Sequence, residues 1–263
     1  MYERELELAI KAAKTAEKAI LEVYAEPFEV EIKPDHSPVT KADKRADEII
    51  REVLSKAFPD DGFLTEESAD TPERLHKSRV WIVDPVDGTK EFVSKNGEFT
   101  TNIALAVDHQ VVVGVVNVPV KKKTYYAVKG QGAFCMGENG LSKAIHVSDR
   151  ESNLRSVRSI SFFRPDEAAF MKRHADRFQD EALPVGAALK FCMLAEGSTD
   201  FIIRLSSGTK EWDVAAGDII VQEAGGFVSE PNGQPFTYNR PDVYNRKGYI
   251  MGNRHQKWMD EID

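Results

Sequence analysis

The sequence predicts an α+β fold in which the order of helices and strands changes partway along the chain. Two helical apolar patterns come first, and β-rich segments separated by turn residues follow them. After about Arg150, strand-like and helix-like segments alternate. We therefore expect an N-terminal α+β half at residues 1–150 and a C-terminal α/β half at residues 151–263, in a chain long enough to bury a full core.

Two helices are predicted near the N-terminus by the spacing of apolar residues. One face of the first helix carries Leu6, Ile10, Ala13, Ile20 and Val23. The second pattern follows helical spacing more cleanly, through Ala46, Ile49, Ile50, Val53, Leu54 and Ala57.

A sheet is predicted to follow these helices. Antiparallel strands are expected at residues 99–107, 111–118 and 124–128, with a hairpin turn at 108–110 and a break at 130–132. The second half then predicts strands at 156–163 and 201–205, helices at 166–178, 187–196 and 214–224, and short strands at 227–228 and 249–250.

Composition limits the class of protein. The chain has 43 acidic and 35 basic residues, a net charge of −8, which argues against a long nucleic acid as a partner but leaves small anions open. No apolar run approaches about 18 residues, and the first residues lack a signal peptide, so we expect no membrane partner and a cytoplasmic location. The two cysteines have no metal-binding or disulfide spacing.

The segment Trp81-Ile82-Val83-Asp84-Pro85-Val86-Asp87-Gly88-Thr89-Lys90 joins an apolar run directly to two carboxylates, a glycine and a hydroxyl. We expect a short interior strand that Pro85 ends, with Asp84 and Asp87 close enough to bind one cation or bridge two. Gly88 allows close approach of a ligand, and Thr89 and Lys90 open a helical turn with free N–H groups. The alternative is an ordinary polar turn.

Two further acidic clusters stand at the ends of apolar segments. One is Glu66-Glu67, and the other includes Glu211, Asp213 and Asp218. Together with Asp84 and Asp87 they predict an all-oxygen site for hard cations. Alternatively, Glu66 and Glu67 form a solvated loop pair, and Asp213 is only the N-cap of a helix beginning at Val214.

These motifs, with Ser37-Pro38-Val39-Thr40-Lys41-Ala42-Asp43, resemble the inositol monophosphatase superfamily of magnesium-dependent, lithium-sensitive phosphatases. Within it, the segments 84–92 and 96–100 are similar to the bacterial 3′(2′),5′-bisphosphate nucleotidases. The resemblance covers about residues 37–252. It implies a layered αβαβα sandwich with the active site between the two halves.

The resemblance also implies roles for the acidic residues. The metal ligands would be Glu66, Asp84, the carbonyl of Val86, Asp87 and Asp213, and they would hold two or three Mg²⁺ ions. Glu67 would act from behind the ligands. The pair of Asp43 and Thr89 would activate a metal-bound water as the nucleophile. On residue type alone, Asp43 is equally well a first-turn acid that stabilises its helix.

Two cations distinguish the implied substrate. Arg204 stands where inositol monophosphatases carry a glutamate, and Lys190 matches a lysine of the nucleotidases. Both suit a second phosphate, although each could instead be an ordinary surface cation. Ala187-Ala188 departs from the serine pair usual in nucleotidases. The remaining expected substrate contacts are Gly88, Thr89, Lys90, Gly186, Ala187 and Asp213.

The expected activity is removal of the 3′-phosphate of adenosine 3′,5′-bisphosphate, with its sulfated form as a further candidate substrate. An inositol-1-phosphate or broad sugar-phosphate phosphatase is the alternative, and a non-catalytic metal- or nucleotide-binding regulator is the third candidate. The partner is expected to be a small phosphorylated molecule, and the protein could also form a homodimer.

Overall fold

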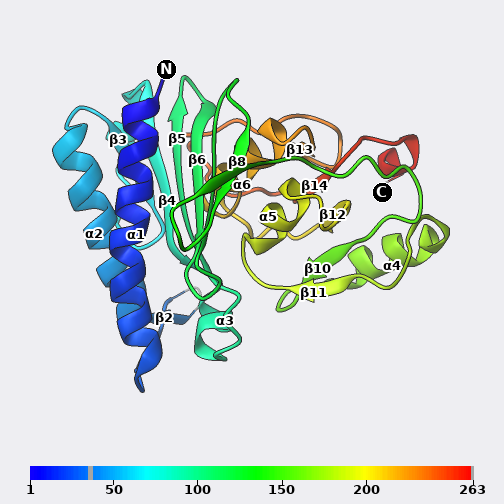
Figure 1. The fold of residues 1–263 in the computed structure, drawn as a ribbon, viewed down its shortest axis with the longest axis horizontal. Coiled ribbons are helices and arrows are strands. Elements are labelled where there is room, and N and C mark those ends of the chain that lie inside the picture. Colours follow the sequence, from blue (N-terminus) through cyan, green and yellow to red (C-terminus); the bar gives the residue numbers. More distant parts are fainter. Residues whose placement is uncertain (35–37, 262–263) are drawn as a thin grey trace.

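The computed structural model describes residues 1–34 and 38–261, which build five alternating layers of helices and sheets (Figure 1). A helix pair, a seven-stranded sheet, a second helix pair, a three-stranded sheet and an outer helix follow one another across the molecule. The predicted αβαβα layering is confirmed. Ser37, which opens the first motif, lies outside the described residues.

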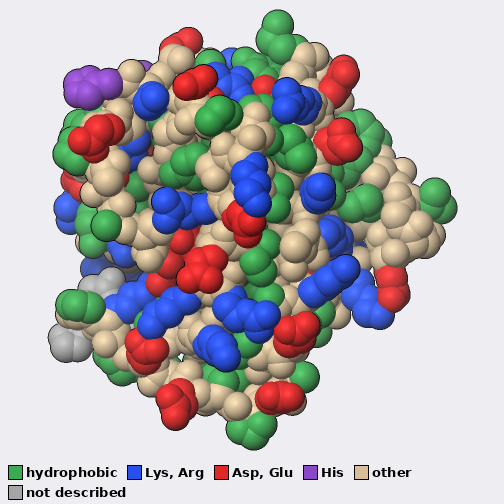
Figure 2. Space-filling view, turned by 90° about the vertical axis from the view of Figure 1, so that its left-hand side faces the viewer, with side chains coloured by type: hydrophobic (Ala, Val, Ile, Leu, Met, Phe, Trp, Pro, Cys, Tyr) green, Lys and Arg blue, Asp and Glu red, His purple; other side chains and the backbone are tan. Residues whose placement is uncertain are grey.

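The first layer consists of α1 (Glu3–Ala25) and α2 (Lys41–Ala57), which lie side by side on one face of the large sheet. The fully buried side of α1 is mostly alanine, whereas Leu6, Ile10 and Val23 of the predicted face are only partly buried. Acidic and basic side chains are mixed over the outer surface of this layer, as Figure 2 shows. Several of them pair, including Lys56 with Glu52 on α2.

The large sheet contains seven strands in the order in which they occur along the chain. They are β3 (Gly62–Thr65), β4 (Arg79–Asp87), β5 (Thr100–Val107), β6 (Gln110–Val118), β7 (Lys123–Val128), β8 (Ala133–Met136) and β9 (Ser142–Ile145). β3 pairs with β4 in parallel, and every later neighbour is antiparallel. The three predicted antiparallel strands are confirmed, whereas β3, β8 and β9 were not predicted.

The expectation that Pro85 ends its strand is wrong. β4 continues to Asp87, and its register against β5 shifts between the pairs Asp84–Asn102 and Asp87–Thr100. A proline is compatible with a strand at such an irregularity, because no ladder N–H is needed there. The carbonyl of Pro85 accepts a hydrogen bond of 2.9 Å from the Thr101 hydroxyl. The strand therefore carries both carboxylates, with the irregularity between them.

The middle helix layer consists of α5 (Leu189–Ala195) and α6 (Glu211–Glu223), which cover the opposite face of the large sheet. α6 lies unusually close to β6. A Cβ atom on Gly114 of β6 would lie 2.4 Å from Cγ2 of Ile219 and 2.6 Å from the carbonyl oxygen of Ala216. The missing side chain thus sets the depth at which α6 packs on the sheet.

The fourth layer is a sheet of β12 (Phe201–Arg204), β14 (Tyr249–Gly252) and β13 (Phe227–Ser229), in that order. Alternate residues of β12 face opposite ways: Ile202 joins the core with α5 and α6, whereas Ile203 packs with Phe170. Phe170 belongs to α4 (Pro165–Arg173), the outer helix. Both faces of this sheet are therefore covered.

Shorter elements complete the described chain. They are β1 (Val30–Ile32), β2 (Pro38–Thr40), α3 (Thr89–Val93), β10 (Val157–Ser159), β11 (Leu183–Val185) and the 3₁₀ turns η1 (Pro72–His76), η2 (Ala175–Arg177) and η3 (Lys257–Asp260). Within the described residues, no helix is both long and apolar enough to cross a membrane. The domain boundary at residue 150 falls between β9 and β10 and stays a prediction.

Two predicted elements are shorter than expected. The strand predicted at 156–163 is only β10, because the N–H of Phe162 donates to the Ser159 hydroxyl and turns the chain into a loop. The helix predicted at 166–178 ends at Arg173. There the backbone of His174 leaves helical geometry, and its ring packs against Phe170 and Trp258 at centroid distances of 4.7 and 5.2 Å.

We expect Gly114→Ala to lower the free energy of unfolding by about 1–3 kcal/mol, because the added methyl group must push α6 away from β6. Urea unfolding measures this change. Gly137→Ala is the matched control, since a Cβ atom there meets only Asn139 Oδ1, at 3.5 Å. Equal stability of Gly114→Ala and wild type would contradict the close packing of α6.

Candidate active site

A cavity of about 580 Å³ opens where the end of β4 and the starts of α3 and α6 meet. Acids and cations line it together. The acids are Glu66, Asp84, Asp87, Glu91 and Asp213, and the cations are Lys90, Lys190, Arg204 and Lys210. Val86, Gly88, Thr89 and Ala187 also line it, so most predicted site residues meet in one place. Asp43, Glu67 and Gly186 lie outside the lining.

Three carboxylates come together at the floor of this cavity. One oxygen of each of Asp84, Asp87 and Asp213 lies within 4.8 Å of the others. Asp84 is buried, and the other two are half-buried. Glu66 follows β3 directly, and its N–H donates to the carbonyl of Val83 at 3.2 Å, which ties it to β4 beside the cluster.

Burial, and then the charges of neighbouring groups, make these carboxyl groups hold their protons more tightly. Burial, followed by the charges of neighbouring acids, raises the pKa of Asp84 well above its ordinary value. Burial, Asp87 and Glu66 raise the pKa of Asp213 to about 8. Burial raises the pKa of Asp87 to about 6, although the charge of Lys190 opposes this shift. A divalent cation would relieve the repulsion, and carboxylate oxygens are the donors that Mg²⁺ prefers, so this donor set fits the metal.

Lys33, which was not predicted as a site residue, pairs with both glutamates of the neighbouring cluster. Its ammonium lies 3.1 Å from Glu66 and 2.5 Å from Glu67. Burial raises the pKa of Glu67 to about 7, and the hydrogen bond from Lys33 only partly offsets this effect. No motif surrounds Lys33 in the sequence, so nothing there indicated this contact.

Asp43 lies behind the cavity and bonds to both Thr40 and Thr89. Its Oδ2 accepts from the N–H and the hydroxyl of Thr40, at 2.8 and 2.6 Å. Its Oδ1 accepts from the Thr89 hydroxyl at 3.2 Å, and that hydroxyl also lies 3.3 Å from the carbonyl of Val86. Thr40 is the N-cap of α2 and Asp43 its third residue, so Asp43 serves the helix and contacts Thr89 at the same time.

Gly88 places Thr89 and Lys90 at the cavity wall. Its φ of 87° lies in the left-handed region, and a Cβ atom there would come within 3.0 Å of the Ala187 Cβ. Any larger residue would therefore be strained and would crowd the wall. Gly186, by contrast, donates its N–H to Glu98 at 2.8 Å and does not line the cavity.

Lys190 and Arg204 are buried cations of the cavity wall, so the alternative that they are ordinary surface cations is wrong. The ammonium of Lys190 donates to the carbonyl of Ala187 at 2.7 Å. Burial lowers the pKa of Lys190, and the charge of Asp87 opposes that shift. The guanidinium of Arg204 donates to the carbonyl of Phe162 and lies 3.5 Å from Glu167.

Asp213 is the third residue of α6 and not its N-cap, which is a correction to the alternative drawn from the sequence. The N-cap is Lys210, whose N–H donates to Asp213 Oδ2 at 2.6 Å. The helix begins at Glu211, three residues earlier than predicted, because the Glu211 side chain is buried against the N–H groups of Asn239 and Arg240, at 2.7 and 2.9 Å.

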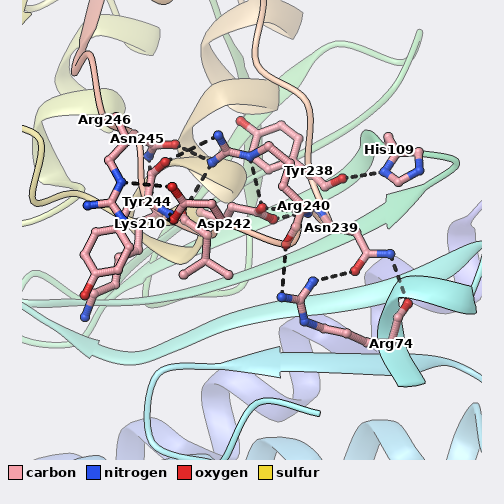
Figure 3. A network of polar contacts seen from close by, with 12 residues as sticks. Arg74, His109, Lys210, Tyr238, Asn239, Arg240, Asp242, Tyr244, Asn245 and Arg246 are labelled. Atoms are coloured by element: carbon pink, nitrogen blue, oxygen red, sulfur yellow. Dashed lines mark hydrogen bonds and ion pairs between the residues drawn. The ribbon is translucent and has the colours of Figure 1, made fainter. Parts of the chain in front are cut away.

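A polar network holds this start of α6 against the rest of the molecule (Figure 3). Asn245 donates to the carbonyl of Lys210 at 2.9 Å and accepts from Arg240 at 2.7 Å. Arg74 of η1 reaches the same loop, donating to Asn239 at 2.8 Å. The network involves residues far apart in the sequence, so periodicity could not have predicted it.

Comparison with known proteins agrees with this fold and site. A "3'(2'),5'-bisphosphate nucleotidase CysQ" of Salmonella typhimurium is 38% identical over 247 residues, covering 93% of this chain and 98% of that protein. The crystal structure of CysQ from Bacteroides thetaiotaomicron is similar with a TM-score of 0.85 and 33% identity, covering 97% and 99% of the two chains. A SuhB structure from Bartonella henselae has a TM-score of 0.78 and 29% identity, covering 96% of this chain and 95% of that one.

The protein is thus an enzyme of the phosphatase class. The chain belongs to the inositol monophosphatase family, which its sequence matches over residues 1–262.

We expect the metal-free protein to lose stability as pH rises from about 4 to about 8. In this range the folded chain binds more protons than the unfolded chain, because folding raises the pKa of Asp213 from 3.8 to about 8, and stability therefore falls with pH. Mg²⁺ should relieve the repulsion, so it should raise the melting temperature more at pH 8 than at pH 5. Thermal unfolding with and without Mg²⁺ at both pH values measures this.

Asp213→Asn should reduce the Mg²⁺ increment at pH 8. Asp218→Asn is the control, because Asp218 is a buried carboxyl group of the same helix that bonds to Tyr238 and Gln222 outside the cavity. Its Mg²⁺ increment should match wild type. Equal increments at pH 5 and pH 8 in the wild type would contradict the cation site.

Proposed function

We propose that this enzyme is a Mg²⁺-dependent phosphomonoesterase that removes the 3′-phosphate of adenosine 3′,5′-bisphosphate, giving AMP and phosphate. One observation carries the proposal: the buried cations Lys190 and Arg204 line the same cavity as the acidic cluster. A substrate with two phosphates can place one at the acids with their cations and the other at the arginine. The names of the CysQ relatives support this substrate class.

The metal is held, in this proposal, by Glu66, Asp84, the carbonyl of Val86, Asp87 and Asp213, as two or three Mg²⁺ ions. When bound, Mg²⁺ polarises phosphoryl oxygens and makes water a stronger acid. The protein groups must then orient water and substrate. Glu67 has a supporting part, since it shares Lys33 with Glu66 and thereby fixes the position of that side chain.

Thr89 and Asp43 orient the attacking water and receive its proton. The Thr89 hydroxyl donates to Asp43 Oδ1, which leaves its oxygen lone pairs free to accept from a water in the cavity. The two bonds from Thr40 hold Asp43 in place during this transfer. Water then attacks phosphorus as the bond from phosphorus to the ribose 3′ oxygen breaks, and that oxygen takes a proton from a solvent water to leave as the 3′-hydroxyl of AMP.

Substrate orientation follows from the wall around the acids. Lys90 offers a cation at the exposed edge, while Gly88 and Ala187 keep that wall shallow. In this proposal Lys190 would face both phosphates, since its charge interacts with both Asp87 and Arg204, and it also opposes protonation of Asp87. Gly186 supports the position of Ala187 through its bond to Glu98.

Thr89→Ala should lower kcat about 10²–10⁴-fold, because the water would lose its orienting hydroxyl and its proton acceptor. KM and Mg²⁺ affinity should stay close to wild type, since the carboxylates are unchanged. Thr89→Ser is the matched control and should keep most of the activity. Steady-state kinetics and calorimetric Mg²⁺ titration measure these quantities, and a Thr89→Ala enzyme with normal kcat would sink the role of the hydroxyl.

Arg204→Gln should reduce kcat/KM for adenosine 3′,5′-bisphosphate by about 10–150-fold, because a charge-assisted hydrogen bond is worth about 1.5–3 kcal/mol. Hydrolysis of inositol 1-phosphate should change much less. The test is phosphate release from both substrates by wild type and variant. If the wild type prefers inositol 1-phosphate, the sugar-phosphate alternative replaces the nucleotidase. If it releases phosphate from neither substrate, with or without Mg²⁺, the result favours a non-catalytic regulator.

A further inference from the structure

Phe162 is an aromatic side chain that the cavity leaves open to solvent. It lines the cavity and is 51% exposed. The other aromatic side chains of this cavity, among the described residues, are buried or half-buried: Phe191, Trp212, Tyr244 and Tyr249. An exposed phenyl ring on the wall of an otherwise charged cavity offers apolar surface to a ligand.

The loop around Phe162 is held rigidly from both sides. Its N–H donates to the Ser159 hydroxyl at 3.2 Å, and its carbonyl accepts from the guanidinium of Arg204. The next residue back, Ser161, donates its hydroxyl to Glu91 of α3 at 2.6 Å. These bonds hold the backbone that carries the ring at the cavity wall before any ligand arrives, which lowers the entropic cost of binding there.

Two cations lie over the ring. The ammonium of Lys90 lies 4.0 Å from the ring centroid, and the guanidinium carbon of Arg204 lies 5.4 Å from it. Cation–π attraction holds such groups beside an aromatic face. The cations cover part of the ring, and its exposed remainder, next to their positive charge, complements a ligand with a flat ring and phosphates.

We propose that Phe162 is the stacking platform for the nucleobase of the substrate. This inference rests on the proposed function and adds to it the group that recognises the base. The base would stack on the phenyl ring while Arg204, whose guanidinium also fixes the Phe162 carbonyl, contacts a phosphate of the same molecule. An inositol or sugar phosphate has no flat aromatic ring and gains nothing from this surface.

The experiment compares Phe162→Leu with wild type on adenosine 3′,5′-bisphosphate and on ribose 3,5-bisphosphate, which lacks the base. Stacking on an aromatic side chain predicts a KM for the nucleotide about 5–50-fold higher in the variant. The KM for ribose 3,5-bisphosphate should stay within about twofold of wild type, because that substrate makes no stacking contact. Phe163→Leu is the matched control, since the neighbouring ring packs near Arg158 and does not line the cavity.

Each outcome decides the inference. If wild type hydrolyses the nucleotide but Phe162→Leu leaves its KM unchanged, the stacking platform is overturned and the proposed function stands. Equal losses on both substrates would make Phe162 a structural residue of the loop. A change of oligomeric state in sedimentation, with KM unchanged, would assign the ring to contact between copies of the chain. A wild type inactive on the nucleotide overturns both proposals.

Discussion

Repulsion between carboxylates is the constraint on which the rest of the structure depends. Asp84, Asp87 and Asp213 are confined within 4.8 Å of one another in surroundings that disfavour charge. Like charges at such distances, with little water to screen them, oppose folding unless protons or cations neutralise them. Favourable packing elsewhere in the fold must therefore offset this repulsion. The three carboxylates come from two distant parts of the chain, and each part is held in place separately.

Those two parts are positioned by different means. Asp84 and Asp87 belong to β4, which is bonded on both sides in the large sheet, and the irregularity around Pro85 separates the two side chains. Asp213 belongs to α6, whose distance from the sheet is set at Gly114. The start of α6 is fixed by bonds from Arg240 to Glu211 and from Asn245 to Lys210. Figure 3 shows Arg240, Asn245 and Lys210 of this network. The hydrogen bonds of the sheet and the polar network at the start of α6 thus together position the three carboxylates.

The sequence predicted what local patterns control. Apolar spacing located both N-terminal helices and the antiparallel strands, and the motif resemblance implied the layers and the residues that meet at the cavity. It did not predict β3, β8 or β9, which are only four residues long, or the continuation of β4 through Pro85. In these cases pairing with a neighbouring strand outweighs the local preference.

Polar contacts between residues far apart in the sequence were the other kind of feature that sequence patterns could not predict. The bond between Lys33 and Glu67 spans 34 residues, and that between Arg74 and Asn239 spans 165. A lysine or arginine in a polar stretch looks the same whether it is solvated or bonded. The same limit applies to Gly186, whose N–H donates to the Glu98 side chain and does not point to a ligand in the cavity. The roles of the individual site residues remain predictions from the resemblance and the geometry.

Two carboxylates of the candidate site also stabilise the starts of the helices that carry them. Asp43 and Asp213 are each the third residue of a helix, and each accepts the N–H of its N-cap residue. Such contacts contribute on the order of 1 kcal/mol to the stability of a helix. Descendants of this chain that exchanged either acid for an apolar residue would therefore lose part of the stabilisation of a helix start, together with the role proposed for that acid. Selection for stability would then act on these positions in two opposed directions, because the helix start favours the acid whereas burial and neighbouring carboxylates disfavour its charge.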